Sequence, residues 1–195
     1  MTYLLAEQLH SRAKSLSTKF NQGGETRYIE EAIDLDRQAL ALCPPGHSER
    51  LGSLSQLAFD LGYRYNQLGE MKDLEEAIVL DREALSLRPQ GHPDRSLSLN
   101  NLAARLTSRY NQLGALQDLD EAIILGREAL SLFPQGHPDQ SLFLNNLANC
   151  LSTRYNQLGA LWDLDEAIVL GREALSLRPQ GHPHRSSSLD RKSVV

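Results

Sequence analysis

Tyr110-Asn111-Gln112-Leu113-Gly114 is the third of four related five-residue segments in this chain. Identical copies occupy residues 65–69 and 155–159, and a weaker copy, Phe20-Asn21-Gln22-Gly23-Gly24, precedes them. Each copy begins 45 residues after the one before it, and the last two complete repeats are identical at 36 of 45 positions. A fixed period of this length indicates a tandem array of one structural unit. The predicted repeats cover residues 3–47, 48–92, 93–137 and 138–182, and residues 183–195 are predicted to be a truncated fifth repeat or a flexible tail.

Each repeat is predicted to form two α-helices joined by a short turn. In the third repeat, apolar residues recur every three or four positions from Leu99 to Tyr110 and again from Leu119 to Phe133. This spacing is typical of amphipathic helices. The polar, glycine-ended segment 111–114 between the two stripes suits a turn. No sustained alternation of apolar and polar residues predicts a strand.

Two details of the second helix carry specific expectations. Asp118 precedes Glu121 by three residues, which is the spacing of a capping box and predicts that Asp118 caps the second helix. Gly126 lies inside that helix on its apolar stripe, where a glycine costs roughly 1 kcal/mol relative to alanine. We interpret Gly126, and the equivalent Gly171 of the fourth repeat, as sites of close helix approach, with a tolerated defect as the alternative. The first two repeats carry Asp36 and Asp81 at this position, so they must pack differently there or direct the aspartate to solvent.

Composition restricts the class of protein. Hydrophobic residues make up 41% and charged residues 23% of the chain, which is typical of a folded protein rather than a disordered one. No apolar run is long enough to span a membrane, and the first residues lack the basic region of a secretory signal. The net charge of −5 argues against general binding to nucleic acid. Two cysteines without metal-type spacing predict reduced thiols and a cytoplasmic location, with a nuclear one as the alternative.

The repeats are predicted to stack into one array. A single helical hairpin cannot bury both of its apolar stripes, whereas stacked hairpins share a continuous core. We therefore expect an all-α solenoid of tandem helix-turn-helix repeats that winds into a right-handed superhelix. One histidine recurs at the end of each repeat, and equivalent positions in stacked helices lie at least about 8–10 Å apart. These histidines cannot share one metal ion, so a role in the turn is expected; they are His47, His92, His137 and His182.

The second helices resemble those of tetratricopeptide repeats. Ala122, Ala129 and Pro134 have the spacing of the family's small-residue and proline signature. The paired asparagines Asn100-Asn101 make these repeats resemble the longer repeats of kinesin light chains and those found upstream of caspase-like CHAT protease domains. This resemblance implies a non-catalytic scaffold, without cofactor or metal, that binds a peptide or partner helix in a concave groove. Two alternatives are a regulatory arm of a CHAT-type protease whose catalytic domain is absent from this chain, and a self-assembling array.

The resemblance also places candidate binding residues on the first helices. The groove positions include His10 and Lys14 in the first repeat, Phe59 in the second, and asparagines in the third and fourth. Asparagine amides can bind the main chain of an extended peptide; the candidates are Asn100, Asn101, Asn145, Asn146 and Asn149. For Asn101 and Asn146, hydrogen bonding between helices of the array is the alternative. The groove positions can also be read as solvated residues that are free to vary.

Arginines and net charge suggest the kind of partner. Arg64, Arg109 and Arg154 recur one turn after the groove positions and could clamp a carboxylate or pair with an acidic residue of a neighbouring repeat. The first-helix segments sum to +4 and the second-helix segments to −11. This distribution would steer an acidic or extended protein segment into the groove, or it only keeps the array soluble. A monomer, or weak end-to-end association, is expected.

Overall fold

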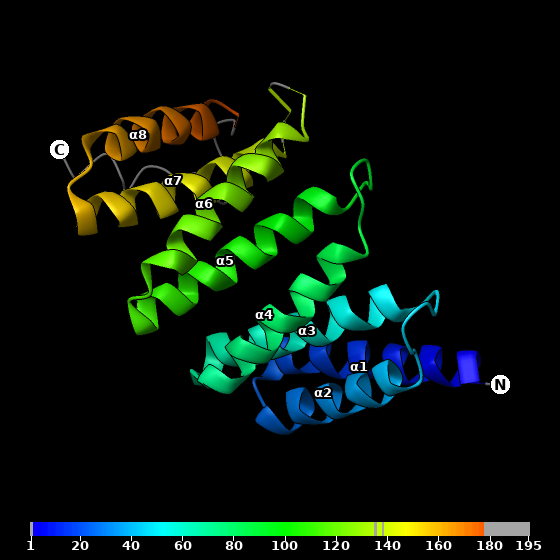
Figure 1. Ribbon diagram of the computed structural model, residues 1–195. Coiled ribbons are helices and arrows are strands. Elements are labelled where there is room, and N and C mark those ends of the chain that lie inside the picture. Colours follow the sequence, from blue (N-terminus) through cyan, green and yellow to red (C-terminus); the bar gives the residue numbers. More distant parts are fainter. Residues whose placement is uncertain (1, 135, 138, 178–195) are drawn as a thin grey trace. The chain divides into compact units, whose positions relative to one another are not determined.

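The computed structural model describes residues 2–134, 136–137 and 139–177. Within these residues the chain forms eight α-helices and no strand (Figure 1). The helices are α1 (Thr2–Gly23), α2 (Thr26–Ala41), α3 (Arg50–Leu68), α4 (Met71–Ser86), α5 (Arg95–Leu113), α6 (Leu116–Ser131), α7 (Gln140–Leu158) and α8 (Leu161–Ser176). The predicted pairing of helices into hairpins and the all-α fold are confirmed.

The chain divides into two compact bodies, which we describe separately. The N-terminal body, Met1–Pro89, holds α1 to α4, and the C-terminal body, Gln90–Val195, holds α5 to α8. In each body two hairpins pack together through the second helix of the first hairpin, so that α2 contacts α3 and α6 contacts α7. The predicted repeat boundaries and the hand of the superhelix stay predictions.

Glycine in the left-handed conformation ends the first helix of a hairpin. Gly69, Gly114 and Gly159 have φ values of 76°, 71° and 67°. Each donates its N–H to the carbonyl of the tyrosine four residues earlier, at 2.8, 2.7 and 2.7 Å. Glycine adopts this conformation without steric cost and satisfies a free carbonyl at the helix end. This requirement explains the glycine that ends the recurring Tyr-Asn-Gln-Leu-Gly segment. A turn is present, but it is shorter than the predicted residues 111–114, because residues 111–113 belong to α5 and only Gly114 and Ala115 separate α5 from α6.

The capping-box interpretation of Asp118 is wrong. Helix α6 begins at Leu116 with Ala115 as its N-cap, and no side chain caps it. Asp118 lies in the first turn, buried, and accepts two hydrogen bonds from the Arg109 guanidinium at 2.8 and 2.6 Å. The carboxylate therefore holds the two helices of the hairpin together, because a bidentate arginine pair fixes geometry as well as charge.

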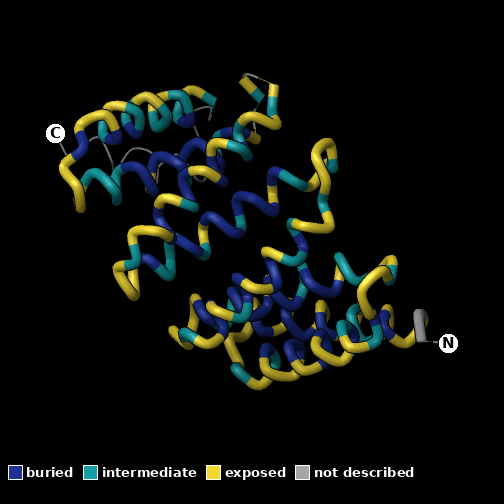
Figure 2. The backbone as a smooth tube through the Cα atoms, in the orientation of Figure 1, coloured by how far each residue is buried: buried dark blue, intermediate teal, exposed yellow. Residues whose placement is uncertain are grey.

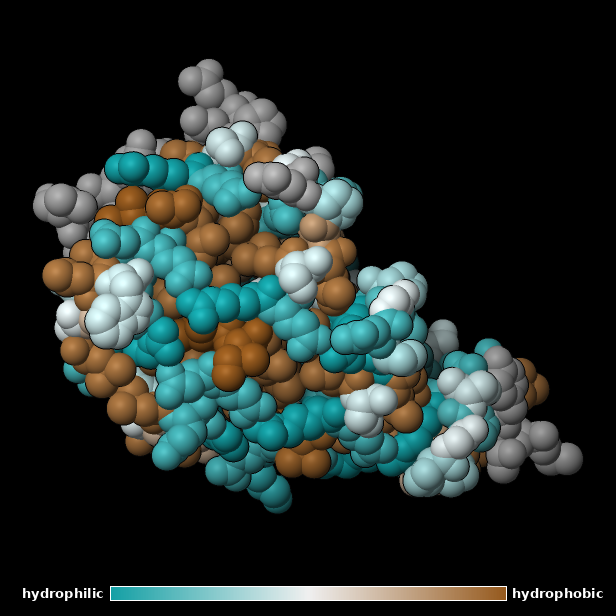
Figure 3. Space-filling model, turned by 45° about the horizontal axis from the view of Figure 1, so that its top comes forward, coloured by the Kyte–Doolittle hydropathy of each residue, from teal (hydrophilic) through white to brown (hydrophobic). Residues whose placement is uncertain are grey.

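The apolar stripes face each other inside each body. Leu99, Leu102 and Leu106 of α5 are at most 2% exposed, as are Leu119 and Ile123 of α6. Buried positions lie on the helix faces turned toward neighbouring helices, and exposed ones lie on the outer faces (Figure 2). Some large apolar side chains nevertheless remain at the surface, where hydrophobic and hydrophilic residues are interspersed (Figure 3). No helix of the described residues is long and apolar enough to cross a membrane.

Close approach at Gly126 is confirmed. A Cβ atom at this position would lie 3.3 Å from Cδ1 of Leu147 in α7. For Gly171 the interpretation is wrong, because a Cβ there would meet no atom of the described residues within 4 Å. The equivalent aspartates of the N-terminal body do not reach solvent, since Asp36 is 0% and Asp81 6% exposed. The first repeats therefore pack differently at this position.

The predicted turn role of the recurring histidines is confirmed for three of them. Nδ1 of His47, His92 and His137 accepts the backbone N–H of the residue two positions later, at 3.1, 3.1 and 3.3 Å. Each imidazole thereby stabilises the connection between one hairpin and the next. His182 lies outside the described residues, as do residues 183–195.

Replacing Asp118 with alanine is expected to destabilise the C-terminal body by about 2 kcal/mol, because Arg109 loses two charge-assisted hydrogen bonds. Urea unfolding followed by circular dichroism would measure the change. Asp165→Ala, an exposed position on α8, serves as the control and should alter stability by less than about 0.5 kcal/mol. Equal effects of the two substitutions would contradict the structural role of Asp118.

Candidate functional site

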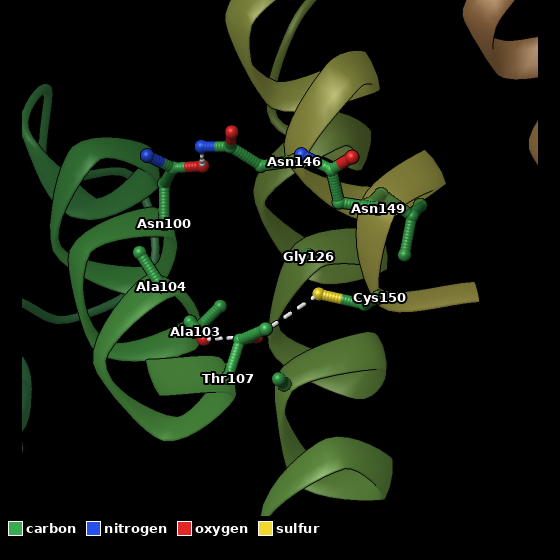
Figure 4. A pocket seen from close by; sticks show the side chains of 10 residues that line it. Asn100, Ala103, Ala104, Thr107, Gly126, Asn146, Asn149 and Cys150 are labelled. Carbon is green, nitrogen blue, oxygen red and sulfur yellow. Dashed lines mark hydrogen bonds between the residues drawn. The ribbon is translucent and has the colours of Figure 1, made fainter. Parts of the chain in front are cut away.

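A pocket of about 180 Å³ opens between α5 and α7 in the C-terminal body, with α6 behind it (Figure 4). Small residues create the space. Ala103 and Ala104 lie on the α5 side, Ala122 and Gly126 belong to α6, and Leu147 forms part of the α7 wall. Larger side chains at these four small positions would occupy the pocket. Gly126, which the sequence indicated only as a site of close helix approach, also forms part of the pocket wall.

Asparagine side chains line one end of the pocket. Nδ2 of Asn146 donates to Oδ1 of Asn100 at 2.9 Å, which joins α7 to α5. Asn149 also lines the pocket and is exposed. Asn145 instead turns back to its own helix and donates to the Ser141 carbonyl at 2.7 Å. The structure thus brings together Asn100, Asn146 and Asn149.

Asn101 and Asn145 are not among the residues that line the pocket. For Asn146 the sequence left two interpretations open, a groove residue or a hydrogen bond between helices, and its position is compatible with both. It makes a hydrogen bond between helices of the array, and it also borders the pocket.

A thiol and a hydroxyl lie toward the other end of the pocket (Figure 4). Oγ1 of Thr107 donates to the Ala103 carbonyl at 2.8 Å and lies 3.2 Å from Sγ of Cys150. Burial raises the pKa of Cys150, and the contact with Thr107 opposes this effect in part. A raised pKa keeps the thiol protonated at neutral pH, where it behaves as a packed, weakly reactive group.

The candidate residues of the N-terminal body occupy equivalent positions on α1 and α3 with different chemistry. Lys14 is exposed, and Phe59 is 53% exposed and stacks on Tyr63 with ring centroids 6.4 Å apart. His10 contacts the buried Asp36, with 3.4 Å between Nδ1 and Oδ1. These side chains present an aromatic and charged surface, not the amide-lined pocket of the C-terminal body.

The three candidate arginines have partners inside the protein. Arg64 binds both oxygens of Asp73 at 2.6 Å, and Arg154 binds Asp163 at 2.8 and 2.7 Å, as Arg109 binds Asp118. The aspartate is in the same repeat each time. Arg154 also donates to Asp120 of the preceding repeat at 2.8 Å, the type of pair expected from the sequence. Hydrogen bonds to these aspartates raise the pKa of Arg64 and of Arg154.

Charged and metal-binding groups are scarce around the pocket. None of its ten lining residues carries a charge. Across the described part of the chain, no group of three or more His, Cys, Asp or Glu side chains is arranged to hold a metal ion. The pocket therefore offers neutral hydrogen-bonding groups around an apolar interior.

Comparison with known proteins supports the fold. Residues 96–139 match the tetratricopeptide repeat family model. The nearly identical TPR-like repeats of a Podosopora anserina protein named as a kinesin light chain superpose with a TM-score of 0.65 at 21% identity, over 94% of this chain and 82% of that chain. BtubC (BKLC) from P. vanneervenii is similar with a TM-score of 0.53 at 17% identity, over 97% of this chain and 80% of that chain. No curated protein matches. These structures share an all-α repeat solenoid with this chain.

Cys150 is expected to react slowly with iodoacetamide at pH 8, because its raised pKa and burial leave little accessible thiolate. Mass spectrometry of the digested protein would give the alkylation rate of this residue. In urea-unfolded protein the same cysteine should react at the rate of an ordinary thiol. Fast alkylation of Cys150 in the folded protein, with a midpoint below pH 8.5, would contradict the assignment.

Proposed function

We propose that this chain, whose residues 96–139 match the tetratricopeptide repeat family model, is a non-catalytic scaffold that binds an extended segment of a partner protein at the pocket of the C-terminal body. The observation that carries this proposal is the opening between α5 and α7, which is lined by asparagine amides over an apolar interior. Such a site offers hydrogen bonds to the peptide main chain and apolar contacts to a side chain, which are the two kinds of contact that an extended peptide needs.

The polar contacts suit a peptide main chain. An asparagine amide has two donors and an acceptor, and a single hydrogen bond joins Asn100 and Asn146. Asn149 is exposed at the same opening. These groups can pair with the N–H and C=O groups of an extended segment, which recur at regular intervals whatever its sequence.

The interior suits a small, uncharged side chain. Ala103, Ala122 and Gly126 border a volume of about 180 Å³, and no charged residue lines it. A charged side chain would lose its hydration there without gaining a partner. Arg109 and Arg154, which could have attracted an acidic segment, are already bound to aspartates. We therefore propose a neutral extended segment as the ligand, while the CHAT-protease arm and self-assembly stay predictions of the sequence.

Replacing Ala104 with phenylalanine is expected to weaken peptide binding at least about tenfold by obstructing the pocket. The chain itself carries phenylalanine at the equivalent exposed position, Phe59, so the helix should tolerate the change. Wild-type protein would first select ligands from a displayed library of random peptides, and their affinities would then be compared by calorimetry. The control is Ile124→Phe, at a 64%-exposed position of α6, which should bind normally. Selected peptides that bind Ala104→Phe as well as wild type would refute the proposed site.

Replacing Asn149 with alanine is expected to weaken the selected peptides about fivefold, which is the loss of one hydrogen bond of about 1 kcal/mol. Asn101→Ala provides a matched control, because Asn101 is a neighbouring asparagine of the same array that does not line the pocket. Calorimetric titration of both variants with one peptide separates the two positions. A larger loss for Asn101 than for Asn149 would show that another face of α5 and α7 binds the peptide.

A further inference from the structure

Three titratable side chains from three helices meet inside the N-terminal body. They are His10 of α1, Asp36 of α2 and Asp60 of α3. Both aspartates are 0% exposed. Nδ1 of His10 lies 3.4 Å from Oδ1 of Asp36, and the two carboxyl groups are close enough to share a hydrogen bond if one of them carries a proton. The cluster therefore lies where the first hairpin packs on the second.

The hydrogen bonds of this cluster are incomplete without a proton. Oδ2 of Asp60 accepts from Ser17 at 2.8 Å and from Gln56 at 3.3 Å. Within the described residues, however, Oδ1 of Asp60 and both oxygens of Asp36 have no hydrogen-bond donor. Carboxylate oxygens only accept, and leaving them buried and unpaired is costly. A proton on either carboxyl converts one acceptor into a donor and satisfies an oxygen of each group.

The junction at which the two hairpins of the C-terminal body pack together has no such cluster. The residues 90 positions further along the chain are all uncharged: Asn100, Thr107, Gly126 and Cys150 stand where His10, Ser17, Asp36 and Asp60 stand in the N-terminal body. The contact from Ser17 to Asp60 has its counterpart in the contact from Thr107 to Cys150. The two junctions thus share their geometry and differ in their capacity to bind a proton.

We propose that Asp36, Asp60 and His10 form a proton-binding site that makes the packing of α1 and α2 on α3 depend on pH near neutrality. This property is separate from peptide binding, since it belongs to the N-terminal body and requires no ligand. The C-terminal body, with its uncharged junction, is the internal reference.

The surroundings of Asp60 and of His10 raise the pKa of each group. Burial, followed by the contact with Asp36, raises the pKa of Asp60 to about 7, although Ser17 and Gln56 oppose this. The 3.4 Å contact with Asp36 raises the pKa of His10 against the effects of burial and of Lys14, the charged neighbour on α1. Both groups hold their proton more tightly in the folded state than in the unfolded state. Folding is therefore favoured at low pH, and this contribution is lost as pH rises through about 7.

Hydrogen exchange of the full chain at pH 6 and pH 8 tests the proposal. After correction for the intrinsic exchange rates, protection in α1, α2 and α3 should fall about tenfold between these values, as expected for an Asp60 pKa of about 7 and an ordinary pKa of 3.8. Protection in α5, α6 and α7 should change less than about twofold. Equal changes in both bodies would overturn the proposal.

A variant and a direct titration complete the test. Asp60→Asn keeps the shape, stays neutral and offers a donor to Asp36, so it should remove the contribution of Asp60 and reduce the pH dependence of the N-terminal body to that of His10. Asp34→Asn, at an exposed carboxylate of α2, should retain the wild-type pH dependence. An unchanged pH dependence in Asp60→Asn would refute the proposal. If that variant does not fold, the carboxyl carbon resonance of Asp60 in the wild-type protein decides, since a midpoint below pH 5 contradicts the site and one near 7 supports it.

Discussion

Within each body, a hairpin has an apolar surface that its own two helices cannot cover, and the structure depends on how the other hairpin of that body covers it. In the N-terminal body, one core runs through four helices, from Phe20 of α1 through Ile33 of α2 and Leu61 of α3 to Ala84 of α4. Burial of such side chains stabilises the fold by about 1.5–3 kcal/mol each. Helices α2 and α6 are the central elements, because each contacts a first helix on either side.

The residue at position 126 of α6, or at the equivalent position 36 of α2, decides whether a pocket or a charged cluster lies where the two hairpins pack together. A glycine at position 126 lets Leu147 approach and leaves room for a pocket between α5 and α7. An aspartate at the equivalent position 36 instead places a buried carboxylate beside Asp60. One backbone arrangement therefore gives a neutral pocket in one body and a buried acid pair in the other.

The charges of the two helices are largely matched inside each hairpin. The first-helix arginines Arg64, Arg109 and Arg154 bind aspartates in the first turn of the following helix, and exposed pairs such as Arg37 with Glu76 add weaker contacts between successive repeats. The sequence shows this arrangement only as an excess of positive charge in first helices and of negative charge in second helices. In the structure these ion pairs connect the two helices of a hairpin, because each arginine donates to both oxygens of its aspartate.

The sequence alone determined the repeat, the helical hairpins, the glycine turns and the role of His92 in its connection, because these follow from local periodicity and backbone geometry. Through their positions on the first helices, it also indicated Asn100 and Asn149 as candidate groove residues, and both line the pocket. Only the tertiary structure decided that Asn145 turns back to its own helix, that Asp118 pairs with Arg109 instead of capping, and that Asp36 stays buried beside Asp60. These outcomes depend on which side chains meet across helices from separate parts of the chain, and that information is set by packing distance and burial, not by spacing along the sequence.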